Sequence, residues 1–269
     1  MKKILLTLIL IPALALCLPL TLAAQTGRVY LPLLIRDSQC QPLVFSAFGD
    51  SITSCYFDSF QVNFPNCGYP LRVRERLVAA YQREFAFYNN GVGGEGTDGG
   101  LSRFQWTIND PSLWCVDPTG SSTSCLYPAN TSNRQVGLII ILEGVNDLGG
   151  LTPYDFIEAN LRAMVTIALQ NKLPVFMATI LPVTSKPGED RTAQAQRIYE
   201  FNPRIAQIAM DFQIPLVDFY SAFVNTPNWE NLLITDDGLH PNDQGFELMT
   251  DVLIRVILPL LTTEGCYSG

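Results

Sequence analysis

The chain has 269 residues, of which 48% are hydrophobic and 16% charged, and it carries a formal net charge of −8. Most of this length suits one α/β domain that is large enough to bury a sizeable core. The negative charge, together with the absence of any long run of basic residues, disfavours DNA, RNA or another polyanion as a partner.

Residues 1–24 are expected to be a signal peptide. Lys2 and Lys3 precede an apolar run over residues 4–22, and the small residues Ala23 and Ala24 follow it, an order typical of a cleavable export signal. The run is longer than an average signal core, so an uncleaved N-terminal anchor is the alternative. Because two prolines interrupt the run, we expect cleavage, no stable membrane span afterwards, and a secreted or extracytoplasmic protein.

A lead segment over residues 25–41 is expected to precede one domain over residues 42–269. In this domain, apolar segments of strand length alternate with segments of helical spacing. The sequence predicts, in chain order, a strand over 43–47, a helix over 69–85, strands over 85–88 and 136–142, a helix over 154–169, a strand over 174–180, a helix over 192–212, a strand over 215–219 and a helix over 243–261. Such alternation predicts βαβ units and a parallel sheet, which binds ligands at the carboxyl ends of its strands.

A polar segment rich in proline, serine and threonine, residues 110–135, separates the second and third predicted strands. We expect a surface loop there, with a lid or rim beside a binding site as the alternative. The nearby aromatic residues Phe104, Trp106 and Trp114 belong either to the core or to a pocket for a sugar ring or an acyl group.

The chain has seven cysteines, of which Cys17 falls within the expected signal peptide. An even number of remaining cysteines in an exported chain suggests disulfides. Their spacing suggests the pairs Cys55–Cys67, Cys115–Cys125 and Cys40–Cys266, while leaving other pairings open. A zinc site is disfavoured because the chain has no CxxC motif and a single histidine, so no metal is expected.

The single histidine, His240, lies within the sequence Asp237-Gly238-Leu239-His240-Pro241. Imidazole is the usual base that activates a serine nucleophile, and a carboxylate can fix its tautomer. Asp237, three residues earlier, is the expected carboxylate, and the adjacent Asp236 is the alternative. A purely structural histidine at the entry of the last helix is the alternative interpretation of this motif.

The candidate nucleophile is Ser51, which follows the first predicted strand in the sequence Gly49-Asp50-Ser51. A sheet holds a residue at this position rigid while leaving it exposed to a ligand. By itself, however, the tripeptide is a weak signal, because it is more typical of an ordinary turn.

Two further motifs offer donors for a developing negative charge. Residues 89–96 are rich in glycine, which lets a backbone N–H point at a ligand. Their GxGxxG pattern is also that of a dinucleotide site, but it follows the second strand instead of the first. Asn146, after the third strand, offers a neutral side-chain amide, although an Asn-Asp pair can also simply turn the chain.

In this order the four motifs resemble those of the SGNH hydrolases, also called the GDSL esterase/lipase family, over about residues 44–253. The resemblance implies a flavodoxin-like three-layer α/β/α sandwich with a mostly parallel five-stranded sheet. It assigns the family's four named residues to Ser51, Gly94, Asn146 and His240, with Asp237 beside the histidine. The chain departs from many members in reading Ser-Ile-Thr where they have Ser-Leu, and in the 110–135 insert.

The resemblance implies a serine esterase that hydrolyses carboxylic esters with short acyl groups, or acetylated carbohydrates, without a cofactor. Ser51, His240 and Asp237 would form the catalytic triad, and the backbone N–H groups of Ser51 and Gly94 with the Asn146 side chain would bind the oxyanion. An exported O-acyltransferase using the same residues and a catalytically silent carbohydrate-binding module are the alternatives. We expect a monomer whose partner is its small-molecule or carbohydrate ester.

Overall fold

The computed structural model of the protein describes residues 44–59, 67–83, 85–109 and 137–262. The expected signal peptide, the lead segment and the 110–135 insert therefore lie outside the described residues. None of the helices in the described ranges is long and apolar enough to cross a membrane.

Five parallel strands form one sheet in the order β2-β1-β3-β4-β5. Their bounds are β1 Val44–Gly49, β2 Ala86–Gly91, β3 Leu138–Leu142, β4 Val175–Ala178 and β5 Leu216–Val217. Every residue of β1, β3 and β4 is buried, as expected for parallel strands that are covered on both faces. The prediction of a parallel α/β sheet is confirmed, and the strand order is that of flavodoxin-like folds.

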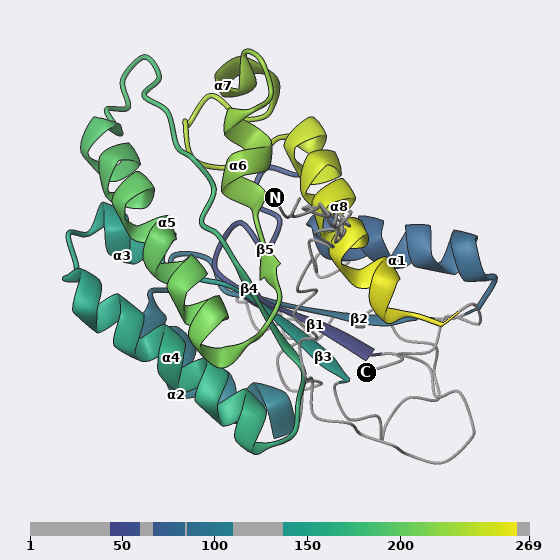
Figure 1. The fold of residues 1–269 in the computed structure, drawn as a ribbon. Helices are drawn as coiled ribbons and strands as arrows, with labels where there is room; N and C mark the ends of the chain where they lie inside the picture. Colours follow the sequence, from purple (N-terminus) through teal and green to yellow (C-terminus); the bar gives the residue numbers. More distant parts are fainter. Residues whose placement is uncertain (1–43, 60–66, 84, 110–136, 263–269) are drawn as a thin grey trace, which may run out of the picture.

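Helices cover both faces of the sheet and complete three layers (Figure 1). The first and last long helices, α1 (Gly68–Tyr81) and α8 (Asp243–Ile257), pack together on one face. The opposite face is covered by α2 (Thr97–Asn109), α4 (Tyr154–Gln170) and α5 (Thr192–Phe212). Shorter elements are α3 (Val145–Gly149), α6 (Phe219–Val224), α7 (Trp229–Leu232) and the 3₁₀ turn η3 (Leu258–Leu260).

The structure corrects several predicted bounds. The helix predicted over 69–85 ends at Tyr81, because Gln82 adopts the left-handed conformation and caps it. The last helix ends at Ile257, and the chain continues as the 3₁₀ turn η3, which contains Pro259. A proline cannot supply the N–H that a continuing α-helix requires.

The second strand is longer than predicted. The sequence suggests that Asn89, Asn90 and Gly91 end the strand in a turn, but all three belong to β2. Asn90 donates a side-chain hydrogen bond of 2.7 Å to the Ser46 hydroxyl on β1, and Asn89 accepts one of 3.1 Å from the Gly91 N–H. Each amide therefore has one partner that offsets part of the cost of its burial, whereas Asn89 Nδ2 and Asn90 Oδ1 are buried without a hydrogen bond.

The helix α2 is not predicted from the sequence, because Gly99 and Gly100 in its first turn have low helix propensity. It forms through tertiary packing against α4. Gly100 lies close to this layer: a Cβ atom there would lie 3.2 Å from Glu143 Oε1 and 3.3 Å from Met164 Cε. Of the aromatic residues considered for a pocket, Phe104 is buried in the core, Trp106 is exposed on α2, and Trp114 lies outside the described residues.

The strand order places a topological switch point beside β1. From β1 the chain moves outward to β2 and then returns to β3 on the other side of β1. Open α/β sheets bind their ligands at such a point, beyond the carboxyl ends of the strands. Ser51, the glycine-rich segment and Asn146 follow β1, β2 and β3 respectively, so all three meet at this edge of the sheet.

Candidate active site

The Ser51 turn begins directly after β1 and is tightly fixed. The Asp50 carboxylate accepts a 2.9 Å hydrogen bond from the Ile52 N–H, and the Ser51 carbonyl accepts one of 3.0 Å from the Tyr56 N–H. The turn also packs directly on the end of β2, since a Cβ atom at Gly91 would lie only 2.1 Å from the Ser54 nitrogen. Only glycine allows this approach, so the sheet itself holds Ser51 in place.

One chain of hydrogen bonds joins Ser51, His240 and Asp237. Ser51 Oγ lies 2.8 Å from His240 Nε2, and His240 Nδ1 lies 2.5 Å from Asp237 Oδ2. The serine and histidine are 189 residues apart in sequence. The partner of the histidine is Asp237, as the three-residue offset predicts, whereas Asp236 is exposed.

The loop that carries the histidine is organised around Asp237. Its Oδ1 atom accepts hydrogen bonds from the Thr235 hydroxyl at 2.6 Å, the Leu239 N–H at 2.9 Å and the His240 N–H at 3.0 Å. The other carboxylate oxygen is thereby directed at the imidazole. A single aspartate thus shapes the loop and orients the ring, and the contribution of Thr235 has no signal in the sequence motif.

The protonation states suit a serine activated by a neutral base. Burial would raise the pKa of Asp237, but the hydrogen bonds from Thr235, His240 and Leu239 outweigh it and lower the pKa to about 2. Burial lowers the pKa of His240, and the charge of Arg191 adds to this; the opposing effect of Asp237 is smaller. At neutral pH the pair is therefore a carboxylate beside a neutral imidazole.

The glycine-rich segment lies against Ser51. A Cβ atom at Gly93 would lie 4.0 Å from Ser51 Cβ. Gly94 has a φ of +75°, a conformation that side chains of L-residues rarely adopt, although nothing lies within 4 Å of a Cβ atom placed there. The backbone conformation, not the lack of space, therefore requires glycine at this position.

Asn146 is the second residue of α3 and is tied to the glycine-rich segment. Its Nδ2 atom donates a 2.8 Å hydrogen bond to the Glu95 carbonyl. An amide nitrogen has two hydrogens, so this bond fixes the side chain while leaving a second N–H for a ligand. Asn146 and Asp147 do not merely turn the chain: both belong to α3.

Asp147 stabilises the start of α2. Its carboxylate accepts hydrogen bonds from the Thr97 N–H at 2.8 Å and the Thr97 hydroxyl at 3.2 Å. A negative group at a helix N-terminus satisfies free N–H groups and interacts favourably with the helix dipole. The carboxylate therefore links α3 to α2 beneath the glycine-rich segment.

A buried ion pair that no sequence motif predicts connects β1 to the glycine-rich segment. Arg103 Nε donates to both carboxylate oxygens of Glu95, at 2.9 and 2.8 Å, and its Nη2 atom donates to the Gly49 carbonyl at 3.1 Å. The guanidinium also lies 3.9 Å from the centre of the Phe48 ring. One signal was present: Arg103 is the only lysine or arginine between Arg83 and Arg134.

Two further carboxyl groups lie buried below the site. Burial raises the pKa of Asp50 to about 7, and the charges of Glu95 and Asp147 act in the same direction. Burial, followed by the charges of Asp50 and Glu95, raises the pKa of Glu143 well above its ordinary value. Burial therefore favours the uncharged form of both carboxyl groups more than exposure to water would.

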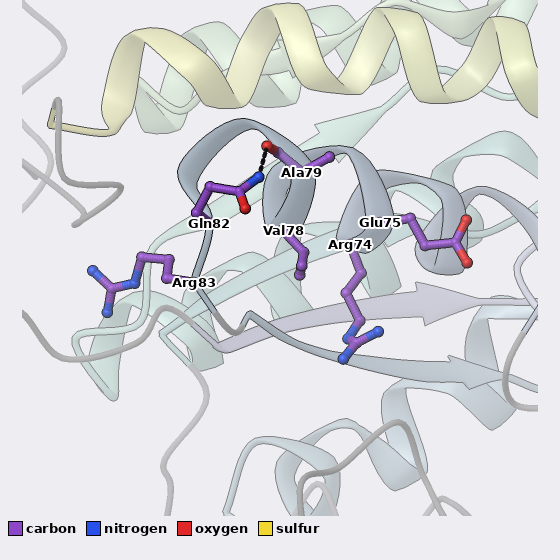
Figure 2. A pocket seen from close by; sticks show the side chains of 6 residues that line it. All are labelled: Arg74, Glu75, Val78, Ala79, Gln82 and Arg83. Carbon is purple, nitrogen blue, oxygen red and sulfur yellow. Dashed lines mark hydrogen bonds between the residues drawn. The ribbon is translucent and has the colours of Figure 1, made fainter.

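A pocket of about 470 Å³ lies along α1, away from Ser51. Figure 2 shows the side chains that line it, which come from α1 and the residues directly after it: Arg74, Glu75, Val78, Ala79, Gln82 and Arg83. This end of α1 leads into the start of β2, whereas Ser51 follows the end of the parallel strand β1. The pocket and the serine therefore lie at opposite edges of the sheet.

The predicted disulfide Cys55–Cys67 is present, with its Cα atoms 5.8 Å apart. The other two predicted pairs, Cys115–Cys125 and Cys40–Cys266, lie outside the described residues. In the described part of the chain, no group of three or more histidine, cysteine, aspartate or glutamate side chains could hold a metal ion.

Comparisons with known proteins relate this geometry to one family. The profile of the GDSL-like Lipase/Acylhydrolase family matches residues 47–248. A search of proteins with curated functions found no match.

Three solved structures illustrate the similarity of fold. A lipase/acylhydrolase from Enterococcus faecalis is 23% identical, with a TM-score of 0.62, over 80% of this chain and 95% of its own. A catalytic mutant of an acetylxylan esterase from Geobacillus stearothermophilus is 18% identical, with a TM-score of 0.60, over 81% and 96%. A psychrotrophic esterase from Pseudoalteromonas sp. is 18% identical, with a TM-score of 0.57, over 80% and 97%.

Proposed function

Because the chain belongs to the GDSL-like lipase/acylhydrolase family, we propose that it hydrolyses carboxylic esters through an acyl-enzyme formed on Ser51. The observation that carries the proposal is the hydrogen-bond chain from Ser51 Oγ through His240 to Asp237. It lies at the ligand-binding edge of the sheet, where a nucleophile can meet a substrate.

The proposed reaction has two steps. In the first, Ser51 Oγ attacks the ester carbonyl while His240 Nε2 takes its proton, and Asp237 stabilises the imidazolium that forms. His240 then gives the proton to the leaving alcohol, which leaves an acyl group on Ser51. In the second step, His240 takes a proton from water, and the resulting attack releases the acid and restores the serine.

The negative charge that develops on the carbonyl oxygen needs donors held in place before the reaction. The backbone N–H groups of Ser51 and Gly94 and the free N–H of Asn146 are proposed to supply them. The Arg103–Glu95 ion pair supports two of these donors, because it fixes the segment next to Gly94 and the carbonyl that holds Asn146. Arg103 and Glu95 are therefore positioning residues.

We propose short acyl groups, including acetyl esters of carbohydrates, as the substrate class. The acetylxylan esterase among the proteins of similar fold supports this choice. The Cys55–Cys67 disulfide supports a proposal that the protein is exported, because disulfides persist mainly in oxidising compartments.

The proposal is tested with p-nitrophenyl acetate, butyrate and octanoate, using wild-type protein and Ser51→Ala. We expect turnover by the wild type, a preference for the shorter acyl groups, and loss of essentially all turnover in Ser51→Ala. Ser102→Ala is the matched control, since this serine on α2 is exposed and its hydroxyl donates a hydrogen bond to the Asp98 carbonyl of the same helix. Turnover that persists in Ser51→Ala would show that another group is the nucleophile.

The pH dependence of kcat/KM is a further prediction. The active form requires neutral His240, so activity falls as the pH drops through the pKa of this residue. Because that pKa is lowered by burial and by Arg191, the midpoint should lie below the ordinary value of about 6.5. Arg191→Gln should move the midpoint to higher pH, and a midpoint at or above 6.5 in the wild type would contradict the predicted environment.

A further inference from the structure

Two exposed aromatic rings stand beside the candidate base. Tyr56 is 46% exposed and Phe57 is 50% exposed, and their ring centres lie 5.1 and 5.5 Å from that of His240. The two rings also contact each other edge to face, with centres 5.1 Å apart. Since His240 forms a hydrogen bond with Ser51, an ester substrate placed at the serine would lie next to these rings.

The chain presents these rings in a rigid and strained conformation. Cys55 and Phe57 have φ values of 62° and 64°, which are uncommon for residues other than glycine. The Cys55–Cys67 disulfide and the ion pair between Asp58 and Arg72 hold the two ends of the segment. Strained residues of this kind persist where the surrounding structure fixes them, and they cluster at ligand sites.

Phe57 also lines a polar groove of about 410 Å³, whose lining does not include Ser51 or His240. Its other lining residues come from the end of the Ser51 turn, from α7 and from the start of α8: Ser59, Asn231, Leu232, Asn242, Asp243 and Gln244. Apart from Leu232 these side chains carry amide, hydroxyl or carboxylate groups, and no lysine or arginine lines the groove. Phe57 therefore lies beside His240 and also lines a groove that is rich in hydrogen-bonding groups.

This combination fits one kind of ligand. A pyranose ring has flat C–H faces that can lie against an aromatic ring, and its hydroxyls can bond to amides and carboxylates. A long acyl chain would have to cover these polar side chains and the half-exposed Asp243 carboxylate, which costs desolvation free energy. An anionic substrate would approach that carboxylate, which already pairs with Arg72 at 3.5 Å, and no lysine or arginine lines the groove itself. We propose that the Tyr56–Phe57 pair and this groove bind a neutral saccharide that forms the alcohol part of the ester. This inference rests on the proposed esterase function.

The test compares two acetyl esters that differ in their alcohol part, acetylated xylotetraose and ethyl acetate. Phe57→Leu keeps an apolar side chain but removes the flat ring. We expect it to lower the ratio of kcat/KM for the saccharide ester to that for ethyl acetate by about tenfold, mainly through KM. Phe57→Tyr should restore the ratio. Trp106→Leu, which removes an exposed ring outside the groove, should leave the ratio unchanged.

Other outcomes overturn the proposal. An unchanged ratio in Phe57→Leu would show that the ring does not recognise the saccharide. A selective loss of activity on ethyl octanoate would show that the groove holds the acyl group instead.

A binding measurement separates this proposal from the proposed function. Calorimetry with Ser51→Ala and acetylated xylotetraose should show binding that Ser51→Ala/Phe57→Leu loses, whether or not the wild type turns the ester over. Absence of binding to Ser51→Ala would overturn the saccharide site. Absence of turnover by a wild type that binds the saccharide would overturn only the esterase function.

Discussion

Replacing Asp237 with asparagine is expected to lower kcat about 10⁴-fold, as is typical of losing the carboxylate partner in a serine–histidine pair. The side-chain oxygen of asparagine can still accept the bonds that Oδ1 receives from Thr235 and from the backbone of Leu239 and His240. The loop should therefore keep its shape. The new amide nitrogen, however, would face His240 Nδ1 and donate to it, so His240 Nδ1 would have to accept a hydrogen bond.

The consequence of this change is a wrong tautomer. If His240 Nδ1 becomes an acceptor, the proton of the neutral ring lies on Nε2. Nε2 could then no longer accept the Ser51 proton across the 2.8 Å contact. The measurement is kcat for p-nitrophenyl acetate near neutral pH, with thermal unfolding to check the fold.

Asp236→Asn is the matched control for this prediction. Asp236 precedes Asp237 directly, is exposed, and undergoes the same change of charge. We expect its kcat to stay close to that of the wild type. A similar loss in both variants would indicate an effect of net charge or of loop stability, and a nearly normal kcat in Asp237→Asn would remove Asp237 from the proposed triad.

The second large effect is expected for Asn146→Ala, which should lower kcat by about 10²–10³-fold, the usual effect of removing one oxyanion donor. The free N–H of Asn146 is proposed to bond the carbonyl oxygen when it becomes negatively charged. An interaction that strengthens only in the transition state affects kcat more than KM. Steady-state kinetics on one short-chain ester would measure both constants.

Two variants distinguish loss of the donor from disturbance of the loop. Asn146→Asp keeps the shape of the side chain but replaces the donor with an acceptor, so its kcat should fall at least as far. Asn171→Ala removes a remote, exposed amide that bonds to the Ile167 carbonyl on α4, and its kcat should be unchanged. A large rise in KM with little change in kcat for Asn146→Ala would instead assign Asn146 to substrate binding.

The sequence by itself was sufficient for the family, the positions of the main strands along the chain and the residues of the hydrogen-bond chain. Continuous apolar runs such as residues 138–142 are characteristic of buried parallel strands, so β3 was predictable from hydrophobicity alone. A single histidine left one candidate for an imidazole base, and its local partner was three residues away. Both features are local in the chain, which is why they can be read without knowledge of the fold.

Tertiary structure decided the features that depend on contacts between distant segments. α2 forms despite two glycines because it packs on α4 and starts at the Asp147 carboxylate. Arg103 and Glu95 acquire their positioning role only when α2 folds back to the end of β1. Tyr56 and Phe57 contact His240 only because the fold brings the loop before the last helix back to the end of β1, although the two segments are far apart in sequence. Local propensity and spacing determine which segments form helices and strands, whereas burial and hydrogen bonds between remote segments determine what surrounds the nucleophile.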